Sequence, residues 1–251
     1  AADDARFLQS ITSKPVKVAL PGPYILTRSM WVKEASGAAY QSKEELGADV
    51  VRVLREEIAE LLALGVEFIQ FDEPVLTELV FTQGQTRTFM CAALSARKDP
   101  AAELEFAVEL MRAVLAGFSG TRFGLHVCRG NWSRDESTLL KGSYDALAAT
   151  LNRMPVQQLV LEYSTARAGE LMRFEPPELG LGVVNPRSDD VESADAIARR
   201  VEAALKFYPA EAIFLSPDCG FCTFANRPMA SDDIAAAKVR AIAETARLLR
   251  G

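Results

Sequence analysis

Residues 122–128, Arg-Phe-Gly-Leu-His-Val-Cys, form a short apolar run that ends in a histidine and a cysteine. Successive side chains of a β-strand point to opposite faces, so positions i and i+2 share one face. His126, the single histidine of the chain, and Cys128 are therefore expected on the same face at the end of a strand. Both are zinc-ligand types, but zinc takes about four partners in structural sites, or about three plus an exchangeable one in catalytic sites.

Two later apolar runs also end in residue types that bind metals. The run at 159–161 is followed by Glu162, and the run that begins at residue 213 leads to Cys219. With His126 and Cys128 these residues offer nitrogen, sulfur and oxygen donors at the ends of three predicted strands. A carboxylate among thiolates indicates a working site, because it is the hardest and most labile ligand of the set for a borderline-soft ion.

Each of these residues also has a structural interpretation. A lone strand histidine is often a hydrogen-bonded core residue, and free cysteines are commonly buried and merely packed. The shared face of His126 and Cys128 and the recurrence at several strand ends favour a metal site. Cys219 and Cys222 also form a CxxC pair, typical of redox motifs or half of a zinc knuckle, but a knuckle needs a second such pair.

Strand-like runs alternate with longer helical patterns along the chain, which is typical of β/α units and a parallel sheet. We expect strands at 16–20, 68–71, 179–184 and in the runs ending at Cys128, Glu162 and Cys219, and helices at 42–64, 100–118, 144–153, 193–208 and 232–249. The polar clusters follow the carboxyl ends of strands, where a TIM-type (β/α)8 barrel builds its active site. An open doubly wound sheet is disfavoured, because the chain has no glycine-rich dinucleotide fingerprint.

The number of predicted strands is smaller than a closed barrel requires. About six strands are convincing, whereas closure needs eight. Either residues 1–13 and the loops hold further strands, or the first one or two β/α units lie upstream of this chain. We expect the second, with residues 1–251 as a single α/β barrel domain.

The composition is that of an ordinary globular enzyme-sized chain. Its 251 residues are 49% hydrophobic and 25% charged, with a formal net charge of −6. That acidic balance disfavours nucleic acid and anionic membranes as partners. No apolar stretch approaches the roughly 20 residues of a membrane span, and no signal-peptide pattern is present. Four cysteines in a chain of this length predict reduced thiols and a cytoplasmic location.

Several ordered motifs resemble the catalytic C-terminal barrel of cobalamin-independent methionine synthase. These are Lys14-Pro15-Val16-Lys17, Gly22-Pro23, Ile69-Gln70-Phe71-Asp72-Glu73, His126-Val127-Cys128, Glu162, Gly180-Leu181-Gly182-Val183 and Pro217-Asp218-Cys219-Gly220. Within the superfamily the chain is similar to short, single-barrel homologues. The family's barrel begins with two further strands upstream, which agrees with the number of strands predicted here.

The resemblance implies both a metal and a reaction. It implies Zn²⁺ held by His126, Cys128, Glu162 and Cys219, and Asp72, with Glu73 beside it, facing the amino group of homocysteine. The implied activity is a zinc-dependent S-methyltransferase that moves a methyl group from a methyltetrahydrofolate to homocysteine and gives methionine. For Asp72 and Glu73 the structural alternative is an acidic pair that is solvated or caps a helix.

Three positions depart from the family's pattern. Asn185-Pro186-Arg187 stands where the family has an Asp-x-His pair, so the family's proposed proton donor is missing, and Asn185 and Arg187 become candidate catalytic residues. Arg187 is either a site for an anionic group or a surface arginine. Trp31 either serves as the family's pterin-stacking tryptophan or packs under the barrel rim. Finally, Arg129-Gly130-Asn131-Trp132 replaces the usual residues after Cys128, which changes the pocket above the metal.

Three alternatives to the folate-dependent reaction stay open. In the first, the methyl donor is a methylcorrinoid protein. In the second, the enzyme is an epoxyalkane:coenzyme M transferase in which Arg187 and Arg129 bind the sulfonate. The third alternative, from a different class, is a non-catalytic ligand-binding barrel with structural zinc. The choice of thiol distinguishes the methyltransferase from the coenzyme M transferase, and a metal spectrum that ignores added thiols would favour structural zinc.

Overall fold

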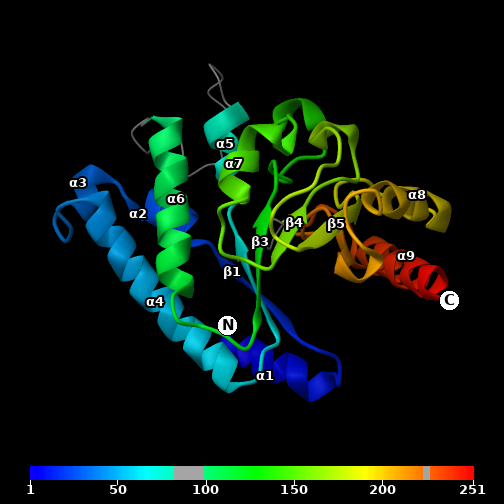
Figure 1. Cartoon of the computed structure of the whole chain (residues 1–251), viewed down its shortest axis with the longest axis horizontal. Helices are drawn as coiled ribbons and strands as arrows, with labels where there is room; N and C mark the ends of the chain where they lie inside the picture. Colours follow the sequence, from blue (N-terminus) through cyan, green and yellow to red (C-terminus); the bar gives the residue numbers. More distant parts are fainter. Residues whose placement is uncertain (82–98, 223–226) are drawn as a thin grey trace.

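A computed structural model of the chain describes residues 1–81, 99–222 and 227–251. Its centre is a parallel sheet in which each strand pairs with the next strand along the chain (Figure 1). The strands are β1 (Lys17–Pro21), β2 (Phe68–Asp72), β3 (Arg122–Val127), β4 (Gln158–Leu161), β5 (Glu178–Val184) and β6 (Ile213–Pro217). This consecutive parallel order is that of a (β/α)8 barrel, and the described residues supply six of the eight strands that closure needs. The predicted fold class and strand positions are confirmed.

Helices follow most strands and cover the sheet. They are α1 (Ala2–Ile11), α2 (Pro23–Met30), α3 (Lys33–Ser36), α4 (Lys43–Ala63), α5 (Leu76–Phe81), α6 (Pro100–Leu115), α7 (Ala148–Leu151), α8 (Ala194–Ala204) and α9 (Asp232–Arg250). The long helices begin where short polar side chains can accept a backbone hydrogen bond, as Ser42 does from the amide of Glu45. Among the described residues, none of these helices combines the length and the apolar character needed to cross a membrane.

Three segments bear on the sequence-based expectations: the first agrees with the one preferred, and the other two differ. Residues 1–13 hold helix α1, with Ala2 and Ala5 on its buried side, and so supply no hidden strand. The helix predicted over 144–153 is instead a 3-10 turn, Tyr144–Leu147, followed by the single turn of α7. Helix α2 was not expected, because it is short and starts directly at the Gly22-Pro23 motif.

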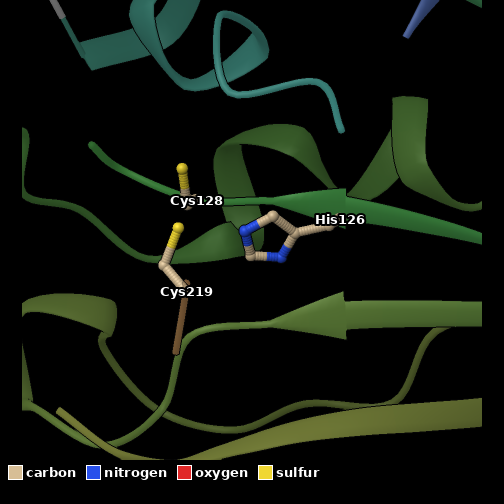
Figure 2. Close-up of side chains that lie close together, drawn as sticks. All are labelled: His126, Cys128 and Cys219. Carbon is tan, nitrogen blue, oxygen red and sulfur yellow. The ribbon is translucent and has the colours of Figure 1, made fainter. Parts of the chain in front are cut away.

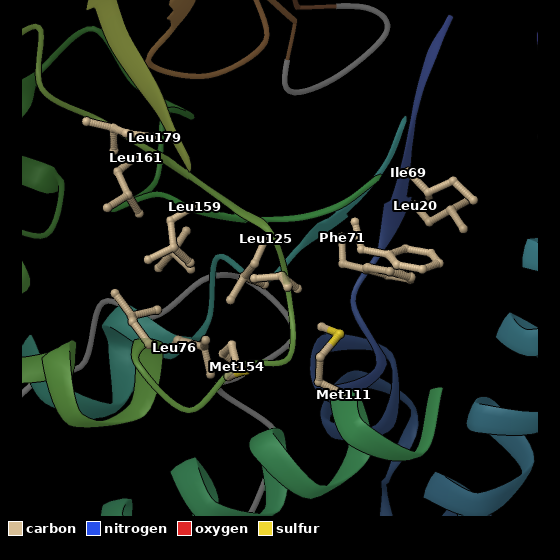
Figure 3. Packing of buried hydrophobic residues seen from close by; sticks show 14 of the residues in the cluster. Leu20, Ile69, Phe71, Leu76, Met111, Leu125, Met154, Leu159, Leu161 and Leu179 are labelled. Carbon is tan, nitrogen blue, oxygen red and sulfur yellow. The ribbon is translucent and has the colours of Figure 1, made fainter. Parts of the chain in front are cut away.

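The hydrophobic core lies between the sheet and its helices. Strand side chains such as Phe71, Leu125 and Leu159 meet Met111 of α6 and Leu76 of α5 (Figure 3). Strands β4 and β5 are buried almost throughout, which explains why their sequences are continuous apolar runs rather than alternating ones. This packing fixes the carboxyl ends of neighbouring strands relative to one another, and those ends carry the predicted site.

Candidate metal centre

His126, Cys128 and Cys219 converge at the carboxyl ends of β3 and β6 (Figure 2). One ligand atom from each residue lies within 4.8 Å of the other two. His126 is in β3, Cys128 directly follows that strand, and Cys219 lies two residues beyond the end of β6. The convergence predicted for these three residues is therefore present.

The histidine ring is oriented by a backbone carbonyl on the neighbouring strand. His126 Nδ1 lies 2.9 Å from the carbonyl oxygen of Val160, its register partner in β4. We assign the ring proton to Nδ1, because a carbonyl can only accept. His126 Nε2 is buried without a hydrogen-bond partner, and a ring nitrogen faces the two sulfur atoms (Figure 2). A buried ring nitrogen without a hydrogen-bond partner is a position that a metal ion can satisfy once it replaces any proton there, and one nitrogen with two sulfurs suits zinc.

The charges around the three residues favour a cation. Burial by itself lowers the pKa of His126, but the neighbouring Cys128 side chain, with the charges of Asp72 and Glu162, raises it to about 9. The hydrogen bond with Cys219 and burial raise the pKa of the Cys128 thiol. The pocket thus stabilises positive charge and retains protons at positions where a metal would replace them.

Glu162, the fourth predicted ligand, lies in a different set of contacts. It follows β4 and is buried, but it is not part of the group formed by the histidine and the two cysteines. Its Oε2 accepts from the backbone amide of Arg129 at 2.9 Å, and its Oε1 accepts from the amide nitrogen of Asn131. Arg129 Nη1 and Arg167 Nη2 lie 3.4 and 3.3 Å from the carboxylate. A ligand role for Glu162 remains a prediction.

Asp72 and Glu73 occupy different environments although they are adjacent. Asp72 is half-buried, is the register partner of His126, and accepts a hydrogen bond from Gln70 Nε2 at 2.6 Å. Glu73 is fully buried and accepts from the backbone amides of Tyr24 and Ile25, at 2.7 and 2.9 Å, at the start of α2. Asp72 therefore sits beside the candidate metal ligands, whereas the Glu73 carboxylate caps a helix. Their catalytic roles stay predictions.

Arg187, Asn185 and Trp31 are the remaining predicted site residues. Arg187 is buried, and it donates from Nε to Asn131 Oδ1 at 3.0 Å and from Nη2 to Glu136 at 2.7 Å. Asn185 is half-buried and accepts from the backbone amide of Arg187. Trp31 ends α2 and packs, half-buried, against the core. Of the alternatives left open, the surface arginine is wrong for Arg187; packing under the rim fits Trp31.

Asp218 is a residue of the site whose role the sequence did not reveal. Its Oδ1 accepts from the backbone amides of Tyr163 and Ser164, both at 3.0 Å, and its Oδ2 bonds the Ser164 hydroxyl. Burial, and next the charge of Glu162, raise the pKa of Asp218 to about 7. A Cβ on Gly182 would lie 2.2 Å from Oδ1, which explains glycine there. Asp218, which directly precedes Cys219, thus holds the loop after β4 against the end of β6.

Asp218 had one signal in the sequence, namely its place between a strand end and a candidate ligand. Arg167 had none, because an arginine in a loop gives no indication of where its side chain lies. It is nonetheless buried and donates to the carbonyls of Gly130 and Leu140. Only the folded chain brings this side chain against Glu162.

Solved structures share the fold of this chain. A B12-independent methionine synthase from Shewanella sp. W3-18-1, in complex with selenomethionine, matches with a TM-score of 0.74 at 23% identity, covering 99% of this chain and 66% of that one. A methyltransferase from Methanosarcina mazei matches with a TM-score of 0.51 at 15% identity, covering 97% of this chain and 63% of that one. At these identities the likeness concerns the fold alone.

Similar sequences carry the comparison further. Methionine synthases from Thermococcus kodakarensis and Sulfolobus acidocaldarius are 28% and 26% identical over 222 residues, which is 87% of this chain and 54% of each relative. The chain therefore spans about half the length of the curated relatives it matches. The family profile described as "Cobalamin-independent synthase, Catalytic domain" matches residues 2–246, almost the whole chain. The predicted resemblance is confirmed, and the chain belongs to the cobalamin-independent methionine synthase family, matching its catalytic domain.

Proposed function

We propose that this chain is the catalytic part of a zinc-dependent S-methyltransferase that acts on homocysteine, with a methyltetrahydrofolate as the methyl donor. The observation that carries the proposal is the convergence of His126, Cys128 and Cys219 around the unpartnered Nε2 of the histidine. Three protein ligands of these types are typical of catalytic zinc sites that keep one exchangeable partner. Family membership supports the same reaction class.

The chemistry that the site must perform is activation of a thiol. A free alkyl thiol has a pKa near 8.5, so only a few per cent is thiolate at neutral pH. Zinc supplies, when bound, the positive charge that lowers the pKa of a coordinated thiol and fixes the position of its sulfur. In the displacement, the sulfur forms a bond to the methyl carbon while the bond from that carbon to the donor nitrogen breaks. The electron pair stays on the nitrogen, which then takes up a proton.

We assign the binding of the substrate's ammonium group to Asp72. Its carboxylate is half-buried, lies across from His126 in the strand register, and is oriented by the hydrogen bond from Gln70. A carboxylate beside the ligand set can pair with an ammonium group whose own sulfur lies at the metal. Glu73 then acts on the pocket indirectly, because it fixes the start of α2.

The contacts of the arginines favour homocysteine over coenzyme M. A sulfonate needs donors that are free to turn toward it, but Arg129 has no exposed surface and contacts Glu162. Arg187 is buried as well, and it is bonded to the buried Asn131 and to the partly exposed Glu136. Because the Arg187 guanidinium is held by Asn131 and Glu136, we give it a positioning role and not that of a general acid.

Cobalt substitution tests the proposal directly. The Co²⁺ form of the chain is titrated first with homocysteine and then with coenzyme M while its visible spectrum is recorded. We expect a new sulfur-to-metal charge-transfer band with homocysteine and none with coenzyme M. A band with coenzyme M alone would favour the epoxide-opening reaction, and a spectrum that ignores both thiols would favour structural zinc.

A further inference from the structure

The carboxylate of Glu162 is surrounded by donors on both oxygens. Oε2 accepts from the backbone amide of Arg129 at 2.9 Å and lies 3.4 Å from the guanidinium of the same residue. Oε1 accepts from the side-chain amide of Asn131 and lies 3.3 Å from Arg167 Nη2. Only 2% of the Glu162 side chain is exposed, so water does not replace any of these donors. The carboxylate is thus fully engaged without a metal ligand role.

The donors are themselves fixed in place. Arg129 donates from Nε to the carbonyl of Gly142 at 2.7 Å and from Nη2 to that of Ala168 at 3.1 Å, and its guanidinium lies 3.7 Å from the Tyr144 ring centroid. The other guanidinium, Arg167, donates to the carbonyl oxygens of Gly130 and Leu140, which both lie in the segment after β3. Neither arginine can follow the carboxylate toward a metal without breaking these bonds.

Asn131 connects this cluster to the loop after β5. Its Oδ1 accepts from Arg187 Nε at 3.0 Å and lies 3.4 Å from Arg167 Nη2, while its amide nitrogen donates to Glu162. An asparagine held by donors on its oxygen is forced to present its amide nitrogen to the carboxylate. The orientation of Glu162 is therefore set from three sides by residues of the β3, β4 and β5 loops.

The balance of charges also favours a Glu162 carboxylate that stays with the arginines and not at the metal. The two arginines in contact with Glu162 carry two positive charges and the glutamate supplies one negative charge at their centre. If that carboxylate moved to a metal ion, two buried guanidinium groups would lose their counter-charge, and an unmatched buried charge is strongly destabilising. A zinc ion, in contrast, already has two thiolates available from Cys128 and Cys219 to match its charge.

We propose that Arg129, Asn131 and Arg167 hold the Glu162 carboxylate away from the metal, so that His126, Cys128 and Cys219 alone supply the protein ligands. The inference rests on the proposed zinc site and departs from the four-ligand set that the family resemblance implies. Arg167 is a positioning residue in this arrangement. The arrangement leaves the exchangeable position of the metal open, so a substrate thiol can bind there without first displacing a carboxylate.

Zinc affinity and the Co²⁺ spectrum of two variants and their combination test the inference. Glu162→Gln keeps the shape of the side chain, and its zinc affinity should stay within about threefold of the parent chain with an unchanged spectrum. Arg167→Gln releases one side of the carboxylate. It should raise zinc affinity at least about tenfold and change the spectrum, because the freed carboxylate can now reach the metal. In the variant that combines both substitutions, the zinc affinity and the spectrum should return to those of the parent chain.

The same measurements can overturn the inference. A loss of affinity greater than about tenfold in Glu162→Gln, with no gain in Arg167→Gln, would make Glu162 a resident ligand and overturn the inference. Thermal unfolding monitored by circular dichroism checks that each variant folds. If Glu162→Gln does not fold, Arg167→Gln decides alone: a gain supports the inference and no gain overturns it. A parent chain that binds no zinc would overturn the proposed function, and this inference with it.

Discussion

At the scale of single residues, Cys219 is the most informative position of the candidate metal centre. It follows β6, whereas the other two residues of the group come from β3 and the position after it. We predict that Cys219→Ser lowers zinc affinity by about 100-fold or more, since loss of a residue that merely orients a ligand already costs about 10–100-fold. Competition with a chromophoric chelator measures this.

Cys222→Ser is the matched control, because it makes the same chemical change three positions later in an exposed residue. It should leave zinc affinity within about twofold of the parent chain. Stoichiometric, tightly bound zinc in Cys219→Ser would remove that residue from the ligand set. Equal losses in the two variants would instead indicate that both sulfurs take part.

Asp218 is a second test at this scale, and two substitutions separate its hydrogen bonds from its charge. Asp218→Asn retains an oxygen that can accept from the amides of Tyr163 and Ser164, so we expect a loss of less than about 1 kcal/mol in unfolding free energy. Asp218→Ala leaves both amides buried and unsatisfied and should lose about 2–4 kcal/mol. Urea unfolding of the metal-free chains measures both, and equal stabilities for the two variants would contradict the structural role.

At the scale of elements, the strands and their ends could be predicted while the loop contacts could not. Hydrophobic runs place the strands, and the parallel arrangement brings their carboxyl ends together, which was sufficient to predict that His126, Cys128 and Cys219 meet. Glu162 obeys the same rule for its backbone, but its side chain turns to Arg129 and Arg167. Those partners come from loops, where no periodic pattern relates sequence to side-chain direction.

Helix α2 provides the prediction that belongs to this scale. The Glu73 carboxylate accepts from the first amides of α2, and burial raises the pKa of Glu73 to about 8 from its ordinary 4.5. Between those two values the folded chain binds more protons than the unfolded chain, so the free energy of unfolding falls as the pH rises. The slope from one such group is at most about 1.4 kcal/mol per pH unit.

Glu73→Gln cannot titrate and should therefore remove this contribution. Urea unfolding at about pH 5.5, 6.5 and 7.5 should show the parent chain losing stability relative to the variant as the pH rises. The comparison isolates Glu73, because Asp218, whose pKa is also raised, is present in both chains. Parallel stability profiles for parent and variant would show that Glu73 is ionised in the fold throughout this range.

At the scale of the whole molecule, the candidate metal centre links parts of the barrel that are distant along the chain. β3 and β6 are separated in the sheet by β4 and β5, and among the described residues β1 and β6 each pair with one strand only. A ligand that binds the folded chain and not the unfolded one stabilises it by about 2.7 kcal/mol at 100 times its Kd. A metal held by Cys128 and Cys219 would thus stabilise the folded arrangement in which the ends of β3 and β6 lie close together.

We therefore predict that zinc at about 100 times its Kd raises the Tm of the chain by about 5–10 °C over the chelator-treated protein, since 1 kcal/mol corresponds to about 2–4 °C for a chain of this size. Differential scanning calorimetry with zinc or with a chelator measures the shift. Cys222→Ser should show the full shift, and Cys219→Ser should show almost none at the same zinc concentration. Cys219→Ser lacks the thiolate that follows β6, so in this variant a metal no longer joins the ends of β3 and β6 through that residue. A Tm shift that survives in the variant would therefore place the stabilising metal elsewhere in the chain.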